Sequence, residues 1–276
     1  MLDGGGIGGG YVLHLKNANY WNIVGFTASS GSKGIVLDGS NHVVIDSVHV
    51  TNIGYEGVHF RGFSSDNVFR NSLVDNTGVS APNFGEGVYL GSANSNWGTY
   101  SGGKPDTSDR NQVLNNRIID TAAENIDIKE GSTGGVIKGN YLGGDKIAGK
   151  NSADSWIDVK GNGYLIENNH GVHTAVTLDA STYIACNGKR ASSDQSEAPF
   201  CNGFEVHTAV SGWGENNTFV ANVLDVNANV GNQVVGIWLQ NTAVGKGNVI
   251  KCDNVVNGAT VSAFGYNHFT PLACSS

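Results

Sequence analysis

Residues 35–71 read IVLDGSNHVVIDSVHVTNIGYEGVHFRGFSSDNVFRN, and this stretch decides the fold. It contains one unit twice: an apolar–x–apolar strand, a turn and a second short apolar strand. The first strands are Ile35-Val36-Leu37 and Val58-His59-Phe60, and the second strands are Val43-Val44-Ile45 and Val68-Phe69. A unit that recurs at this length is typical of a solenoid, in which each repeat packs on the next.

The same first strand recurs along the whole chain. Six further copies are Leu13-His14-Leu15, Val88-Tyr89-Leu90, Ile126-Asp127-Ile128, Ile157-Asp158-Val159, Phe204-Glu205-Val206 and Ile237-Trp238-Leu239. In all eight copies the two outer residues are apolar, whereas the middle residue varies. This alternation predicts strands that bury one face and turn the middle residue to the other.

The spacing of the copies favours a parallel β-helix. His14 and Val36 are 22 positions apart, whereas Asp158 and Glu205 are 47 apart, so some coils must carry long loops. A leucine-rich repeat would need leucine at fixed positions, which this pattern lacks. We predict an all-β, right-handed parallel β-helix of about eight coils, a single domain over residues 1–276, with long loops bordering one face.

The two ends of this helix need cover, because open strand edges attract other chains. Residues 1–10 have neither the basic start nor the apolar core of a signal peptide. We expect that the first coil is truncated, that a leader and a cap precede it, and that the tail 251–276 caps the other end.

Asparagines follow several of the second strands by two positions. They are Asn71, Asn116, Asn168 and Asn222. Asparagine tolerates a left-handed backbone and bonds through its side chain. We predict that these four stack in one turn and bond to each other along the helix.

Composition excludes several classes of protein. Charged residues make up 14% of the 276 residues, which is not the signature of a disordered chain. The net charge of −8 argues against a nucleic-acid partner, and no apolar run approaches the roughly 18 residues of a membrane span. An acidic substrate would need a bound cation or a local basic patch. Nothing in the sequence indicates an oligomeric state.

The four cysteines indicate disulfides and a secreted, extracellular protein. Proximity in sequence favours the pairs Cys186–Cys201 and Cys252–Cys274, although four cysteines allow three connectivities. The sequon at Asn216 is compatible with secretion.

The outward positions form two rows, because adjacent strands lie about 4.8 Å apart. The middle residues of the strands form one row, and the residues two positions later form the other. Their charged centre is Asp127, Lys129, Asp158, Lys160, Glu205 and His207, and Tyr89 and Trp238 flank it. A merely solvated face is the alternative interpretation.

Loops border this face and supply further candidates for substrate binding. The insertion 92–110 carries Trp97 and Tyr100, and residues 171–202 form a second long loop. The predicted substrate-binding residues are His59, Arg61, Tyr89, Trp97, Glu205, His207 and Trp238.

The centre of the face has the groups that β-elimination on a uronate polymer requires. That reaction needs a base for the C5 proton and a cation that neutralises the carboxylate. Two adjacent lysines can lower each other's pKa, which suits Lys129 as base and Lys160 as its assistant. Asp127 and Asp158 oppose this unless Ca²⁺ takes up their charge. We predict the catalytic residues Lys129, Lys160, Asp127 and Asp158.

Carboxylates near this centre suit Ca²⁺, which binds six to eight oxygens. The predicted calcium ligands are Glu86, Glu124, Asp127 and Asp158. Glu86 and Glu124 belong to a column with Glu56, for which an inward position or a turn-bracing role stays open.

The coil pattern resembles the pectate-lyase-like superfamily of right-handed β-helices, many of which are secreted and act on acidic polysaccharides. The segment 124–129 (ENIDIK) resembles the calcium-acid and base-lysine segment of family 6 polysaccharide lyases, which act on alginate and dermatan-type chains. This resemblance implies that Lys129 is the base and that Glu124 binds calcium. That family has an Arg-His-Gly on the next coil, so here Lys160 would replace the arginine.

Two other functions stay open. A glycoside hydrolase would use Asp127 and Asp158, about 5 Å apart on adjacent coils, or Asp127 with Glu205. A non-catalytic carbohydrate-binding or adhesive β-helix would use the aromatic residues to stack on sugars. We expect a secreted, calcium-assisted lyase with an acidic polysaccharide as its partner and with neither nucleic acid nor membrane.

Overall fold

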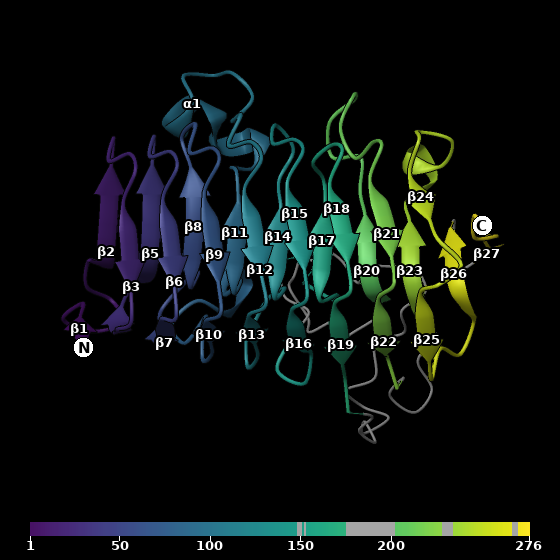
Figure 1. The fold of residues 1–276 in the computed structure, drawn as a ribbon, viewed down its shortest axis with the longest axis horizontal. Coiled ribbons are helices and arrows are strands. Elements are labelled where there is room, and N and C mark those ends of the chain that lie inside the picture. Colours follow the sequence, from purple (N-terminus) through teal and green to yellow (C-terminus); the bar gives the residue numbers. More distant parts are fainter. Residues whose placement is uncertain (148–150, 152, 175–201, 228–233, 267–269) are drawn as a thin grey trace.

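The computed structural model is a parallel β-helix, and the predicted fold is confirmed. It describes residues 1–147, 151, 153–174, 202–227, 234–266 and 270–276. Three sheets run along the molecule, and the chain visits each of them once per coil from the N-terminus to the C-terminus (Figure 1). No helix among these residues is long and apolar enough to cross a membrane.

Sheet I contains all eight predicted first strands. Its strands are β2 (Tyr11–Lys16), β5 (Lys33–Asp38), β8 (Val58–Arg61), β11 (Val88–Leu90), β14 (Ile126–Ile128), β17 (Ile157–Val159), β20 (Asn202–Val206), β23 (Val235–Leu239), β26 (Ser262–Tyr266) and β27 (Thr270–Pro271). The first nine are parallel, which is one coil more than we predicted, and β27 pairs antiparallel with β26.

Sheet II contains the predicted second strands. Its strands are β3 (Asn22–Val24), β6 (Val44–Asp46), β9 (Val68–Arg70), β12 (Gln112–Leu114), β15 (Val136–Lys138), β18 (Leu165–Glu167), β21 (Thr218–Val220) and β24 (Val249–Ile250). One apolar residue from each of these strands points into the helix, for example Phe69, Ile137 and Phe219.

Sheet III completes each coil with very short strands, which were not predicted from the sequence. They are β1 (Leu2–Asp3), β4 (Thr27–Gly31), β7 (His49–Ile53), β10 (Leu73–Val74), β13 (Arg117–Ile118), β16 (Tyr141–Gly143), β19 (His170–Val172), β22 (Val223–Asp225) and β25 (Val255–Asn257).

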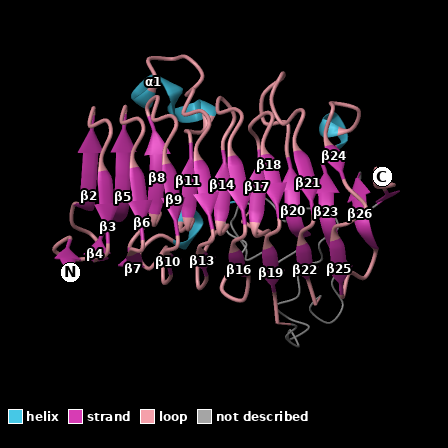
Figure 2. Cartoon of the chain, in the orientation of Figure 1, coloured by secondary structure: helices cyan, strands magenta, loops and turns pink. Residues whose placement is uncertain are grey.

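Helical turns occur only in the connections, as far as the described residues go (Figure 2). They are η1 (Pro82–Phe84), η2 (Asn94–Asn96), α1 (Trp97–Tyr100) and η4 (Asn241–Ala243). η2 and α1 belong to the predicted loop 92–110, which rises beside the turns that join sheets I and II (Figure 1). The predicted loop 171–202 lies mostly outside the described residues.

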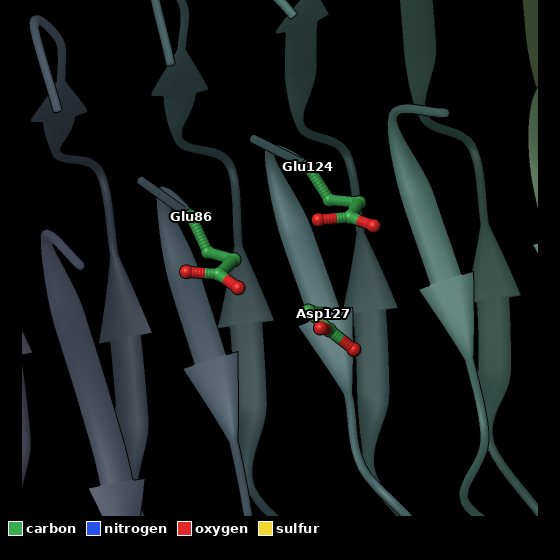
Figure 3. A group of neighbouring side chains, drawn as sticks. All are labelled: Glu86, Glu124 and Asp127. Atoms are coloured by element: carbon green, nitrogen blue, oxygen red, sulfur yellow. The ribbon is translucent and has the colours of Figure 1, made fainter. Parts of the chain in front are cut away.

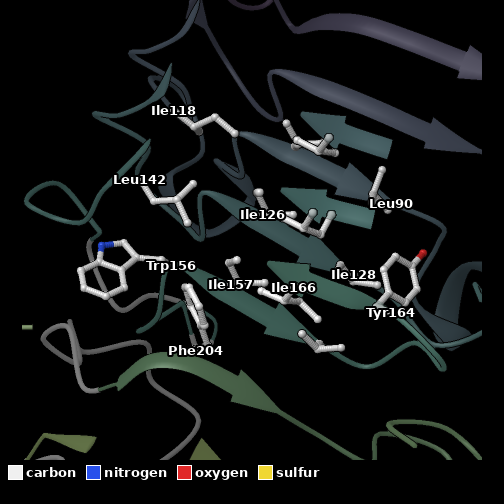
Figure 4. Packing of buried hydrophobic residues seen from close by; sticks show 14 of the residues in the cluster. Leu90, Ile118, Ile126, Ile128, Leu142, Trp156, Ile157, Tyr164, Ile166 and Phe204 are labelled. Carbon is white, nitrogen blue, oxygen red and sulfur yellow. The ribbon is translucent and has the colours of Figure 1, made fainter. Parts of the chain in front are cut away.

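The interior is a continuous apolar column, to which each coil adds the outer residues of its sheet I strand (Figure 4). Trp156 stands in this column where five other coils have glycine (Gly34, Gly57, Gly87, Gly203 and Gly236) and the preceding coil has Asn125. A side chain on Gly171 would come within 2.3 Å of its indole, and one on Gly203 within 3.0 Å. The large side chain is therefore accommodated by two neighbours that have none.

An asparagine ladder runs along the turn after sheet II, but the prediction of its members was partly wrong. The bonded residues are Asn116, Asn140, Asn169, Asn222 and Asn254, and each of the last four accepts a hydrogen bond from the side chain of the one before it. Asn71 and Asn168 lie one position earlier and have left-handed backbones, with φ of 50° and 54°. Asparagine therefore has two roles in this turn: it adopts the left-handed backbone at one position, and its side chain forms the ladder at the next.

The C-terminal part of the chain contains one of the two favoured disulfides. Cys252 and Cys274 are bonded, and Lys251 pairs with Ser275 as an isolated bridge beside them. The other favoured pair, Cys186–Cys201, lies outside the described residues.

Candidate active site

Three parallel rows of side chains lie on the outward face of sheet I. The middle row has the predicted register: His14, Val36, His59, Tyr89, Asp127, Asp158, Glu205 and Trp238 are direct partners from strand to strand. The following row lies two residues later in each strand: Lys16, Asp38, Arg61, Gly91, Lys129, Lys160, His207 and Gln240. The preceding row lies three residues earlier: Tyr11, Lys33, Glu56, Glu86, Glu124, Ser155, Asn202 and Val235.

This face is not a solvated surface. Asp127 is 1% exposed, Asp158 4% and Glu205 3%, and each has a cationic partner. Charges are almost never buried so far unless they are paired. The rows therefore form a packed ionic layer.

Asp127 lies at the centre of this layer. Its carboxylate is 2.5 Å from Nζ of Lys129 and 3.2 Å from Nζ of Lys160, which also pairs with Asp158. Burial alone would lower the pKa of both lysines, but the surrounding carboxylates outweigh it and raise the pKa of each above its ordinary value. Both lysines are ammonium ions here, so in the absence of Ca²⁺ the opposing effect of the acids outweighs the mutual lowering of the two lysine pKa values.

Tyr89 and His59 extend the middle row next to Lys129. The Tyr89 ring centroid lies 4.9 Å from Nζ of Lys129 and 4.4 Å from the centroid of the His59 ring. Burial, with the negative charge of Asp127, raises the pKa of Tyr89, so its hydroxyl keeps its proton. Burial and the nearby cations Lys33 and Arg61 lower the pKa of His59.

His59 is therefore neutral, and its contacts fix which nitrogen carries the proton. Nε2 lies 2.9 Å from the carbonyl oxygen of Gly91, to which it must donate. Nδ1 is then an acceptor, and it is buried without a hydrogen-bond partner among the described residues.

Glu86, Glu124 and Asp127 form an acidic group that could hold a metal ion (Figure 3). One carboxylate oxygen from each residue lies within 4.8 Å of the others, and all three side chains are buried. Burial and the adjacent carboxylates raise the pKa of Glu86 to about 8 and raise the pKa of Glu124 well above its usual range. Oε2 of Glu86 has no described hydrogen-bond partner, so the donor set fits a hard cation.

Asp158, the fourth predicted ligand, is not in this group. It pairs with Lys160, and its other oxygen is 3.7 Å from Nε2 of His207. Charge from these two cations outweighs burial and lowers the pKa of Asp158.

Lys33 belongs to the site, although it is not among the residues predicted from the sequence. Its Nζ is 2.5 Å from the carboxylate of Glu56, which is 3.6 Å from Nδ1 of His59. Lys33 has the same offset from the middle row as the glutamates Glu56, Glu86 and Glu124. This shared offset is the sequence pattern from which Lys33 could have been predicted.

Glu205, His207 and Trp238 continue the rows toward the C-terminus. Nε2 of His207 lies 2.6 Å from Glu205, which also accepts from the side chain of Asn202. The rings of His207 and Trp238 meet edge to face at 5.3 Å. Although burial opposes it, charge from Asp158 and Glu205 raises the pKa of His207.

Arg61 lies at the other end of the site, toward the N-terminus. It pairs with Asp38 at 2.7 Å, and its guanidinium carbon lies 4.1 Å from the ring centroid of Tyr100, in α1. The predicted binding residue Trp97, also in α1, donates from its indole to the carbonyl of Ser92 in its own loop. Tyr100, rather than Trp97, is the aromatic residue of this loop that contacts the rows.

The loop 92–110 is fixed by a buried carboxylate. Asp106 accepts hydrogen bonds from the backbone of Gly62 and Phe63 and from the hydroxyls of Ser92 and Ser108. The position of Tyr100 over Arg61 is therefore set by the fold.

Comparison with known proteins gives the family. No protein-family model matches the sequence, and no curated protein does. PfbA, a surface adhesin of Streptococcus pneumoniae, is similar in structure at a TM-score of 0.51 and 11% identity, over 96% of this chain and 60% of the adhesin, which shows the fold alone. An alginate lyase from Paenibacillus sp. str. FPU-7 is similar at a TM-score of 0.76 and 37% identity, over 97% of this chain and 78% of the lyase. The chain therefore belongs to the same family of polysaccharide lyases as this alginate lyase.

Proposed function

We propose that this protein is a secreted, extracellular lyase that cleaves alginate, or a closely related polyuronate, by β-elimination. The observation that carries the proposal is the 37% identity over 97% of the chain to a protein described as an alginate lyase. The buried ionic layer on sheet I supports it, because elimination needs a base, a proton donor and positive charge beside one another.

Lys129 and Tyr89 are the residues best placed to move protons. Lys129 removes the C5 proton of the uronate, the electron pair forms the C4=C5 double bond, and the C4–O4 bond breaks. Tyr89, which keeps its proton in the free protein, gives that proton to the leaving O4. Lys160, two residues after Asp158, pairs with the substrate carboxylate.

Lys129 must lose a proton before it can act as a base, and the acidic group offers the means. A calcium ion held by Glu86, Glu124 and Asp127 would neutralise the substrate carboxylate and cancel negative charge that keeps the proton on Lys129. Asp158 holds Lys160 in place rather than joining that set.

The pairing of the acids argues against a glycoside hydrolase that uses Asp127 and Asp158. That mechanism needs one carboxylic acid that carries a proton to the leaving oxygen. Asp127 and Asp158 are both paired with lysine ammonium groups, and the pKa of Asp158 is lowered.

Sugars on either side of the cleaved bond would lie along the same rows. His59 and Arg61 line the part nearer the N-terminus, with the loop of Trp97 beside them. Glu205, His207 and Trp238 line the part nearer the C-terminus, where the Trp238 ring offers a stacking surface.

The test is ultraviolet absorbance of the unsaturated product. The protein would be incubated with alginate, polygalacturonate, glucuronan and chondroitin or dermatan sulfate, with Ca²⁺ and with EDTA. A rise on alginate that EDTA abolishes is expected. No rise and no new reducing ends on any polymer would refute the enzyme and leave a binding protein.

Variants locate the site. Lys129→Ala and Tyr89→Phe should each lower the rate of product formation at least about a hundredfold, the usual contribution of one proton-transfer residue. Lys138→Ala is the matched control, because Lys138 is half exposed on sheet II and pairs with Glu167. If Lys129→Ala and Asp158→Asn kept full activity, the site assignment would be wrong.

A further inference from the structure

Arg61 is a buried cation, and one nitrogen of its guanidinium has no hydrogen-bond partner among the described residues. Its side chain is 4% exposed. Nε and Nη2 both bond to Asp38, at 2.7 and 3.3 Å, and Nη2 also donates to the hydroxyl of Tyr11 at 3.2 Å. Nη1 is buried, and no described residue accepts its hydrogens.

The geometry of the guanidinium fixes the direction of this spare nitrogen. The group is planar, and Nε and Nη2 lie along one edge of it. Because that edge faces Asp38 on the preceding strand, Nη1 lies on the side away from Asp38, toward the next strand. A buried charged donor without an acceptor costs stability, so an arrangement of this kind needs a reason.

The next position in the following row has no side chain. It is Gly91, a buried glycine that separates Arg61 from Lys129, and a Cβ built there would be in ordinary contact, at 3.5 Å, with the side chains of Lys129 and Ser132. The carbonyl oxygen of Gly91 accepts a hydrogen bond from His59, and Tyr89 lies on β11, the strand just before Gly91. Two cations, two strands or about 10 Å apart, therefore flank a position that has no side chain of its own.

We propose that Nη1 of Arg61, over Gly91, binds the carboxylate of the uronate next to the one that reacts at Lys129. The proposal rests on the proposed function, because it takes a polyuronate as the ligand. The stack of Tyr100 on the guanidinium and the pair with Asp38 hold Arg61 rigid, so binding costs little side-chain entropy. Recognition at this position is by charge.

The test is equilibrium binding of tetramannuronate, measured by calorimetry in a Lys129→Gln background, so that no turnover occurs. Adding Arg61→Gln should weaken binding about 10- to 100-fold, the contribution of a charge-assisted hydrogen bond. It should also make the affinity less dependent on NaCl, because one screened ionic contact is lost. Arg70→Gln, which breaks an exposed pair with Asp46, is the control and should change neither.

A second variant guards against loss of the fold. Arg61→Lys keeps a cation beside Asp38 but has a single nitrogen, which cannot serve Asp38 and a substrate at once. It should melt close to the parent protein and still bind at least about tenfold more weakly.

Each outcome decides one question. Weaker binding with an unchanged salt dependence would mean that Arg61 merely supports Tyr100. Unchanged affinity, or no binding of tetramannuronate by the parent, would overturn the proposal. A protein that binds with the expected salt effect but forms no unsaturated product would refute the proposed function and leave this inference standing.

Discussion

Replacing Asp127 by asparagine tests the ionic layer most directly. Asn has nearly the same shape, so the change removes charge and little volume. In the variant, Lys160 still has its ion pair with Asp158, but Lys129 loses the carboxylate that is 2.5 Å from its Nζ. Breaking a buried pair in this way costs about 3 to 5 kcal/mol of unfolding free energy.

Proton release sets a ceiling on this cost. Lys129 can lose its proton instead, which costs about 1.4 kcal/mol for each pH unit below its ordinary pKa of about 10.4, or about 5 kcal/mol at pH 7. We expect the pKa of Lys129 to fall below its unfolded value in the variant, because Asp127 is the largest of the charges that raise it and burial then outweighs the remaining carboxylates. The unfolded chain then binds more protons. The stability of the variant therefore rises with pH. In the wild type the pKa of Lys129 is raised, and its contribution is lost only above the ordinary pKa.

Urea unfolding at several pH values is the assay. The difference between the wild type and Asp127→Asn should be largest near pH 7 and should shrink to about 1 kcal/mol near pH 9.5. Asp66→Asn is the control, because it breaks an exposed pair with Arg110 and such pairs contribute little. A difference that is small at pH 7, or independent of pH, would refute the claim that Lys129 is held as a buried ammonium.

Three further predictions concern the ladder, the disulfide and the metal. Asn140→Ala removes four side-chain hydrogen bonds and should lower the unfolding free energy by about 3 kcal/mol, measured in urea, whereas exposed Asn257→Ala should change it little. Changing Cys252 and Cys274 to serine opens a loop of 22 residues and should cost about 3 kcal/mol; an unchanged melting temperature would contradict this. Ca²⁺ at about 100 times its Kd should stabilise the wild type by about 2.7 kcal/mol in thermal melts, and Glu124→Gln should abolish that gain.

The repeated strand made the fold and the register of the middle row predictable. Alternation decides which residues face outward, and the stacking of coils then aligns them even across insertions of different length. Asp127, Asp158 and Glu205 were therefore placed side by side correctly, although 31 and 47 residues separate them in turn.

The state of the site depends on packing that a linear pattern does not contain. The raised pKa of Lys129 follows from four carboxylates around it, on three different coils. The strands of sheet III are two to five residues long, too short for a period to appear. The ladder was misplaced by one residue at Asn71 and Asn168, because the same residue type serves both the left-handed turn and the buried bond.

The nested indole of Trp156 has a consequence for how such a chain can evolve or be engineered. Its space exists because Gly171 and Gly203, one in the same coil and one in the next, present bare backbone to it. Substituting a copy of the Trp156 coil for its successor would put a second indole where Gly203 now stands, against the first. Coils of this region are therefore not interchangeable modules, and recombination or design must move the tryptophan and both glycines together.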